Sequence, residues 1–141
     1  MNAATIHDAV RDGLTRTLAV VGLGGIALIH LLDAPGQFQS APYLGWMYVA
    51  LILGCVAVAA ALIRKSDPRA WVAAGALALS VIVGYTISRT TGLPQDTGDI
   101  GNWGEPLGMA SLFVEGSVVA LSAGVLASRA ERRIAREAYA R

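Results

Sequence analysis

One carboxyl group lies deep inside a long apolar segment, where a charged side chain is costly. Glu115 follows Pro106 by nine residues. Nine residues of helix advance about 13.5 Å, at about 1.5 Å per residue, which would bring this group near the middle of a bilayer. It should then be paired, hydrated or protonated. Glu115 could bind a proton or a cation, balance the charge of a ligand, or hydrogen-bond helices together.

His30 and Asp33 are one helical turn apart near the end of another apolar segment. Side chains at this spacing share a helical face, so the pair could share a proton or contribute to a metal site. Two ligands are too few for a metal, and the other histidine, His7, lies far away in the sequence. A histidine bonded to a backbone carbonyl is the alternative, and we predict no metal site.

Arg89 stands apart from the other ten basic residues, which form three groups elsewhere in the chain. Such an isolated guanidinium needs a local partner. It could pin the segment that follows it through an ion pair, or hold an anionic ligand with two parallel hydrogen bonds. The candidate acidic partners are Asp96, Asp99, Glu105 and Glu115.

Familiar catalytic and redox patterns are missing from the sequence. It has no GxSxG, HExxH or phosphate-binding glycine loop, and no two carboxylates one turn apart within an apolar segment. The single cysteine, Cys55, excludes an intramolecular disulfide and a CxxC pair. With a net charge of +1, the chain offers no basic surface for nucleic acid. The residues therefore name no reaction, cofactor or catalytic residue.

The elements that must position these side chains are four apolar segments. The chain of 141 residues is 55% hydrophobic and 15% charged, whereas soluble domains carry about 25% charged residues. A helix crosses about 30 Å of hydrocarbon with about 20 residues. We predict an all-α fold, a four-helix transmembrane bundle that forms one integral membrane domain over residues 1–141. The expected spans are 14–32, 43–63, 70–87 and 107–127, and a helical tail covers 128–141.

Basic residues predict the orientation of these spans. Ten of the eleven lysines and arginines precede the first span, join the second to the third, or follow the fourth. The positive-inside rule then places both termini in the cytoplasm of a multi-pass protein of the cell (inner) membrane. A cleaved signal peptide is the alternative for the first segment, although no small-x-small cleavage site follows it.

Helix ends and helix contacts have their own signals. Asp67-Pro68 and Glu105-Pro106 combine an N-cap with proline at the first helical position. Pro35-Gly36 and Gly92-Leu93-Pro94 should end the first and third helices. Small residues allow close helix packing in membranes. These are Gly22, Gly25, Gly54, Ser80, Gly84, Ser88, Gly108 and Ser111, and positions 108, 111, 115, 118 and 122 form one face expected to point inward.

Several short motifs resemble those of small, uncharacterised four-helix bacterial membrane proteins. They are His30 with Ala34-Pro35, Tyr43-Leu44-Gly45, Ser88-Arg89-Thr90 with Gly92-Leu93-Pro94, and Glu105-Pro106-Leu107-Gly108. The resemblance covers most of the chain and brings no established activity. It implies that His30, Arg89 and Glu105 belong to one group at the outer face. Many members carry a second histidine where this chain has Gln37, so the resemblance implies no two-histidine metal site here.

These observations together predict a polar cavity open to the outer side, which requires the first, third and fourth spans to be neighbours. The leading interpretation is a non-enzymatic protein that binds a small ligand, ion or partner there, as a sensor, transport component or accessory subunit. A structural subunit of a larger membrane complex is the first alternative, and a membrane enzyme using Glu115 or His30 for proton transfer is the second. Besides the lipid bilayer, partners could be further copies of the chain or a membrane complex. The expected cavity residues are His30, Asp33, Tyr85, Arg89, Trp103, Glu105 and Glu115.

Overall fold

The computed structural model describes residues 3–140, which form four helices and no strand within that range. All four helices are long and apolar enough to cross a membrane. This confirms the predicted all-α fold with four candidate spans. The helices are α1 (Ala3–Ser40), α2 (Pro42–Arg64), α3 (Pro68–Thr90) and α4 (Pro106–Tyr139).

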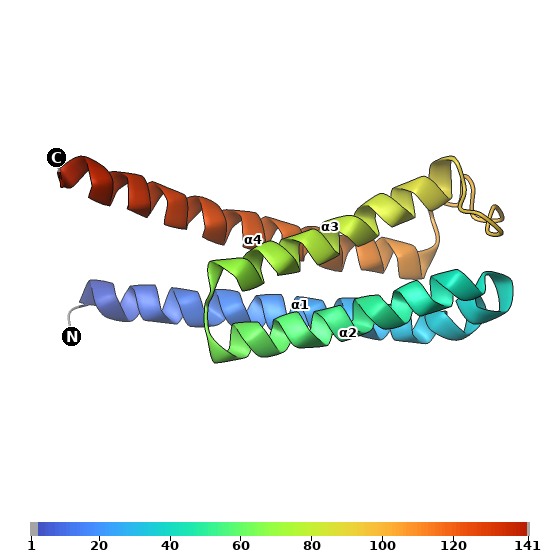
Figure 1. The fold of residues 1–141 in the computed structure, drawn as a ribbon, viewed down its shortest axis with the longest axis horizontal. Coiled ribbons are helices and arrows are strands. Elements are labelled where there is room, and N and C mark those ends of the chain that lie inside the picture. The colour runs from blue at the N-terminus through green and yellow to red at the C-terminus, as the bar shows by residue number, and fades with distance from the viewer. Residues whose placement is uncertain (1–2, 141) are drawn as a thin grey trace.

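The helices form two antiparallel hairpins (Figure 1). Helix α1 packs along α2, α3 packs along α4, and the hairpins meet mainly where α1 contacts α4. Helices α2 and α3 follow each other in the chain but share a much smaller contact. Both chain ends lie at the end of the bundle that carries the α2–α3 connection, and α1 and α4 extend beyond that connection (Figure 1).

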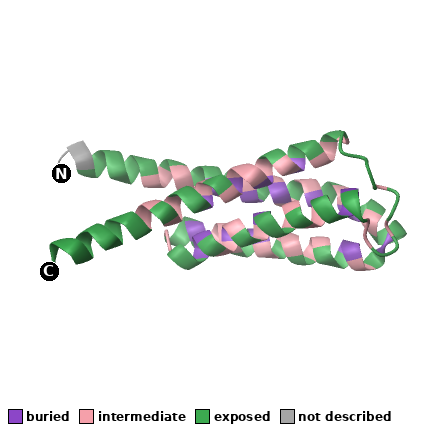
Figure 2. Cartoon of the chain, turned by 90° about the horizontal axis from the view of Figure 1, so that it is seen from above, coloured by how far each residue is buried: buried purple, intermediate pink, exposed green. Residues whose placement is uncertain are grey.

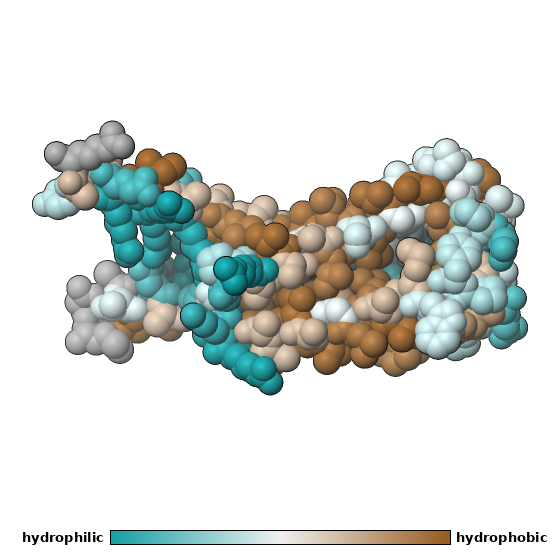
Figure 3. Space-filling model, in the orientation of Figure 1, coloured by the Kyte–Doolittle hydropathy of each residue, from teal (hydrophilic) through white to brown (hydrophobic). Residues whose placement is uncertain are grey.

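Apolar side chains cover most of the outside of the bundle. Leu28, Leu53, Leu79 and Phe113 are all more than half exposed. Figure 3 shows hydrophobic residues over the middle of the face in view and hydrophilic residues toward both ends. A surface of this kind is stable against hydrocarbon and costly in water.

The buried residues form a narrow core along the inner faces of the helices (Figure 2). Its largest member, Trp71, is fully buried and donates its indole N–H to Ser66 Oγ at 3.2 Å. Ser66 in turn donates to Asp12 Oδ1 at 3.0 Å and accepts from Arg129 at 2.5 Å. This network joins α1, α3, α4 and the α2–α3 connection near the end that carries both termini.

Two predicted helix starts are confirmed. The Asp67 side chain accepts a hydrogen bond from the Arg69 backbone N–H at 2.8 Å, and Pro68 is the first residue of α3. Glu105 accepts from the backbone N–H groups of Leu107 and Gly108, and Pro106 begins α4. A side-chain acceptor at each position satisfies helix donors that have no partner within the helix.

The predicted end of the first helix is wrong, because α1 continues through Pro35 and Gly36 to Ser40. Proline within a helix removes one hydrogen bond, here the bond to the carbonyl of Leu31. The helix resumes with two added bonds, from Gln37 to Asp33 and from Ser40 to the Gly36 carbonyl. The chain turns at Ala41, whose backbone angles (φ −144°, ψ 86°) are not helical. Pro42 follows it, and a residue before proline disfavours the helical conformation.

The predicted end of the third helix is confirmed, because α3 ends at Thr90 and Gly92 adopts a φ of +78°. The predicted inward face of α4 is confirmed as well. Its buried residues are Ser111, Glu115, Val118 and Ser122.

Small residues occur where helices approach closely. A Cβ added to Gly22 would lie 2.5 Å from Val118 Cγ2, and one added to Gly108 would lie 2.6 Å from the ring of Tyr85. These contacts join α1 to α4 and α3 to α4. Gly84 differs, because a Cβ there would meet no atom within 4 Å. Gly84 borders a cavity.

Candidate ligand cavity

A cavity of about 740 Å³ lies between the four helices, at the end of the bundle opposite the termini. All four helices and the α3–α4 loop contribute to its walls. Of the residues predicted to line a cavity, the structure brings five together around this one. They are His30, Asp33, Tyr85, Arg89 and Glu105.

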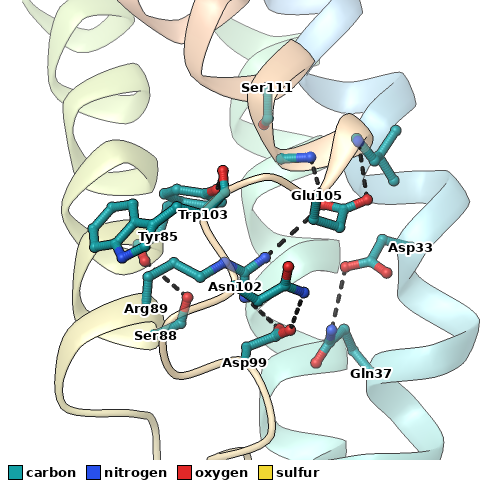
Figure 4. A network of polar contacts seen from close by, with 12 residues as sticks. Asp33, Gln37, Tyr85, Ser88, Arg89, Asp99, Asn102, Trp103, Glu105 and Ser111 are labelled. Atoms are coloured by element: carbon teal, nitrogen blue, oxygen red, sulfur yellow. Dashed lines mark hydrogen bonds and ion pairs between the residues drawn. The ribbon is translucent and has the colours of Figure 1, made fainter.

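Arg89 is the centre of the loop side of the cavity, and its side chain is only 7% exposed (Figure 4). Its guanidinium lies 2.5 Å from Asp99 Oδ2 and 3.9 Å from Glu105 Oε2. The same group stacks 4.7 Å from the centroid of the Tyr85 ring. The Arg89 carbonyl also accepts from the Gly101 N–H at 2.9 Å. Arg89 therefore fixes the loop to the end of α3, as the ion-pair interpretation predicted.

Glu105 links this network to α4. Its two carboxylate oxygens accept from the Leu107 and Gly108 N–H groups at 2.9 and 2.6 Å, while Oε2 also faces Arg89. A negative charge is favourable at a helix N-terminus. The sequence indicated the cap, and the structure adds that the capping carboxylate lies on the cavity wall.

The opposite wall is built by α1 and α2. Asp33 Oδ2 accepts from the Tyr48 hydroxyl and from the Gln37 amide, both at 3.2 Å. His30 is 6% exposed, and its Nδ1 lies 2.9 Å from the Ile26 carbonyl. The Tyr48 and His30 rings form a T-shaped contact with 4.7 Å between their centroids. Gln37 and Tyr48 thus join the site, although neither was among the predicted cavity residues.

The remaining two predicted residues lie beside the cavity and are not among its lining residues. Trp103 packs edge-on against Tyr85, with 6.0 Å between ring centroids, and its carbonyl accepts from the Tyr85 hydroxyl at 3.4 Å. Glu115 is fully buried one turn beyond Ser111, which does line the cavity. The Ser111 hydroxyl donates to Glu115 Oε1, and Oε2 has no hydrogen-bond partner among residues 3–140.

Deeper in the bundle, the cavity wall is mainly apolar. Leu51 of α2 and Leu77 and Val81 of α3 contribute there. Other lining residues on α2 and α3 are exposed, including Met47 and Ser80. Since α2 and α3 also share little contact, the cavity opens between these two helices.

Acidic groups outnumber basic groups around the polar part of the cavity. Its lining includes the carboxyl groups of Asp33, Asp96, Asp99 and Glu105 and a single guanidinium, that of Arg89. Partial burial, followed by repulsion from Asp99, raises the pKa of the Asp96 carboxyl. Within residues 3–140, no three His, Cys, Asp or Glu side chains are grouped to hold a metal ion.

Comparison of the chain with protein-family models, curated proteins and solved structures finds no match.

Proposed function

We propose that this chain is a four-span integral membrane protein of the bacterial inner membrane, with both termini in the cytoplasm. Three features at the end opposite the cavity support this: the start of α1, the α2–α3 connection and the end of α4 lie there together (Figure 1). Within residues 3–140, nine of the ten basic residues lie in these segments or at the helix ends next to them. Cytoplasmic ends of membrane proteins carry such an excess of lysine and arginine. The cavity then lies in the outer half of the bundle.

Reporter fusions test this orientation. A reporter that is active only in the cytoplasm should be active when it is fused at Asp67, in the α2–α3 connection. A reporter that is active only after export should be active when it is fused at Asp99, in the α3–α4 loop. The same location for both positions would contradict the proposed threading.

We further propose that the protein binds a small ligand in the cavity, as a sensor, transport component or accessory subunit. The observation that carries this proposal is the polar end of the cavity, where Arg89 of α3 and His30 and Asp33 of α1 surround an open volume. Purely structural polar groups would fill such space with one another, because voids inside a packed core are costly. The deeper apolar wall and the few converging polar groups are typical of small-molecule sites.

Filling the cavity should remove this function without harming the fold. We expect Gly84→Leu to fold, because a Cβ at this position meets no atom within 4 Å and the side chain would extend beside the cavity wall. A panel of phenylbutylamine, phenylbutanol and phenylbutyrate, tested in nanodiscs, should include a compound that raises the Tm of the wild type. Saturation at about 100 times Kd is worth about 2.7 kcal/mol of stability. Gly84→Leu should show no such shift.

Gly24→Leu is the matched control. Gly24 is exposed on α1, does not line the cavity, and has no atom within 4 Å of an added Cβ. It should keep the wild-type response. Equal shifts in wild type and Gly84→Leu, or no shift with any compound, would contradict a ligand site in this cavity.

A further inference from the structure

We propose that the ligand is a lipophilic amine, with a protonated amino group at the polar end of the cavity and an apolar body toward its deeper wall. This inference depends on the proposed function, because it names the class of ligand that the cavity takes. Three observations support it: which hydrogen-bonding groups of the cavity are already used, which charges lack a partner, and where the cavity opens.

Hydroxyl groups on the cavity wall already donate within the protein. Tyr43 donates to the Pro94 carbonyl at 2.8 Å, and Tyr48 donates to Asp33 at 3.2 Å. The Tyr85 hydroxyl is used by the Trp103 carbonyl. The hydroxyl groups of the serines on the wall also donate hydrogen bonds within the protein. These serines are Ser80, Ser88 and Ser111.

The other donors are also occupied or hidden. The terminal nitrogens of Arg89 face Asp99 and Glu105, whereas its Nε has no hydrogen-bond partner among the described residues but is buried away from the open volume. The Gln37 amide donates to Asp33. An acceptor that binds to the accessible donors named here would have to displace a bond that already exists, which costs more than binding to a free group.

Free acceptors, by contrast, remain on the cavity wall. His30 Nδ1 must donate to the Ile26 carbonyl, because a carbonyl only accepts, so Nε2 of the neutral ring is an acceptor. No described residue bonds to Nε2 or to Asp33 Oδ1, and no described side chain bonds to the Asp96 carboxylate. His30 is more than nine-tenths buried, so its free nitrogen must find its partner within the cavity.

Charge leads to the same class of ligand. Arg89 serves Asp99 and Glu105, whereas Asp33 and Asp96 form no ion pair within residues 3–140. Both of these carboxyl groups line the cavity. A cation bound there would balance their negative charge. An ammonium group supplies both the charge and three donors, and it needs no fixed ligand geometry such as a metal requires.

The opening between α2 and α3 indicates an apolar body. A molecule that reaches the cavity there passes exposed Met47 and Ser80, beside helix surfaces that are covered with apolar side chains. Leu51, Leu77 and Val81 then offer an apolar wall below the polar groups. Burial of apolar area favours a hydrophobic tail by roughly 25 cal/mol per Å², and a small hydrophilic amine would gain none of this.

The test compares three probes that share one apolar body and differ in head group. Phenylbutylamine, phenylbutanol and phenylbutyrate are titrated separately into the wild-type protein in nanodiscs, and their Kd values are corrected for partitioning into empty nanodiscs. Hydrogen bonds to charged groups distinguish such ligands by about tenfold to a hundredfold. We expect the amine to bind at least tenfold more tightly than the alcohol, and the carboxylate to bind most weakly.

Two variants test whether the preference for the amine over the alcohol comes from the unpaired carboxyl groups. Asp33→Asn keeps an oxygen that can accept from Tyr48 and Gln37, so it should fold, weaken amine binding about tenfold and leave alcohol binding unchanged. Asp96→Asn, in the α3–α4 loop, should also weaken amine binding and leave alcohol binding unchanged. It replaces Asp33→Asn in the test if Asp33→Asn fails to fold. Asp8→Asn is the control, because Asp8 is exposed at the opposite end of the bundle.

Each outcome separates the inference from the proposed function. Binding of all three probes with equal affinity, or a preference for the carboxylate, would overturn the amine assignment while the cavity remained a ligand site. Stabilisation by zinc or calcium chloride without amine binding would also overturn it. Binding of none of the organic probes or metal salts would contradict the proposed function itself.

Discussion

Gly22→Ala should destabilise the bundle, although alanine is the better helix former. The added Cβ would lie 2.5 Å from Val118 Cγ2. Val118 is fully buried and branched at Cβ, so its side chain has little freedom to move aside. Overpacking of this kind costs about 1–3 kcal/mol. Helices α1 and α4 form the main contact between the two hairpins, so the loss should appear directly as a lower free energy of unfolding.

Gly24→Ala, two residues further along the same helix, should raise the free energy of unfolding. Its Cβ meets no atom within 4 Å, and replacing glycine within a helix is worth about 0.5–1 kcal/mol.

Combining Gly22→Ala with Val118→Ala should recover part of the loss, because the smaller side chain leaves room for the new methyl group. The wild type, Gly22→Ala, Val118→Ala and the double variant form one double-mutant cycle, and unfolding in mixed micelles measures their four free energies of unfolding. Equal effects at positions 22 and 24 would show that the close contact carries no energy.

The fold was largely predictable because each helix has local signals that agree with its apolar pattern. The caps at Asp67 and Glu105 lie within one turn of the groups they satisfy, so the sequence alone contains the whole interaction. The end of α1 was not predictable from Pro35, because the outcome depends on whether nearby side chains sustain the helix. Gln37 and Ser40 do so here, and Pro42 ends the helix instead.

The candidate site was predictable where a residue type was itself unusual. His30, Asp33, Arg89 and Glu105 are ionisable groups at the ends of apolar segments, and this property is visible in the sequence. Tyr48 was missed because a tyrosine in an apolar run also suits an exposed helix face. Its role depends on Asp33, fifteen residues away across the α1–α2 hairpin. The only available signal was that a hydroxyl within a span needs a partner.

The position of Glu115 was predictable only in part. Counting residues from Pro106 gave its depth along α4, and the pattern of small residues gave its inward direction. How far the cavity extends toward it depends on the side chains of α1, α2 and α3, which no property of α4 reveals. In the structure the cavity reaches Ser111, and Glu115 lies one turn beyond it.

Glu115→Ala should therefore destabilise the protein, and Glu115→Gln should not. Alanine removes the acceptor of the buried Ser111 hydroxyl and leaves a void in the core, at a cost of about 1–3 kcal/mol for the lost bond alone. Glutamine keeps an oxygen for Ser111 and nearly the same volume. Because Glu115 Oε2 has no partner and no basic side chain within residues 3–140 forms an ion pair with it, the neutral amide should leave the free energy of unfolding close to that of the wild type.

Ser122→Ala provides a control on the same face of α4. The Ser122 hydroxyl is buried and has no hydrogen-bond partner among the described residues, so its removal should be neutral or stabilising. Adding Ser111→Ala to Glu115→Ala should cost little more, since the bond is already lost. If Glu115→Gln is as destabilising as Glu115→Ala, the carboxylate must be held by a cation that glutamine fails to attract. Glu115 would then be the counter-charge of a bound ligand, and its role as a hydrogen-bond acceptor for Ser111 would be secondary.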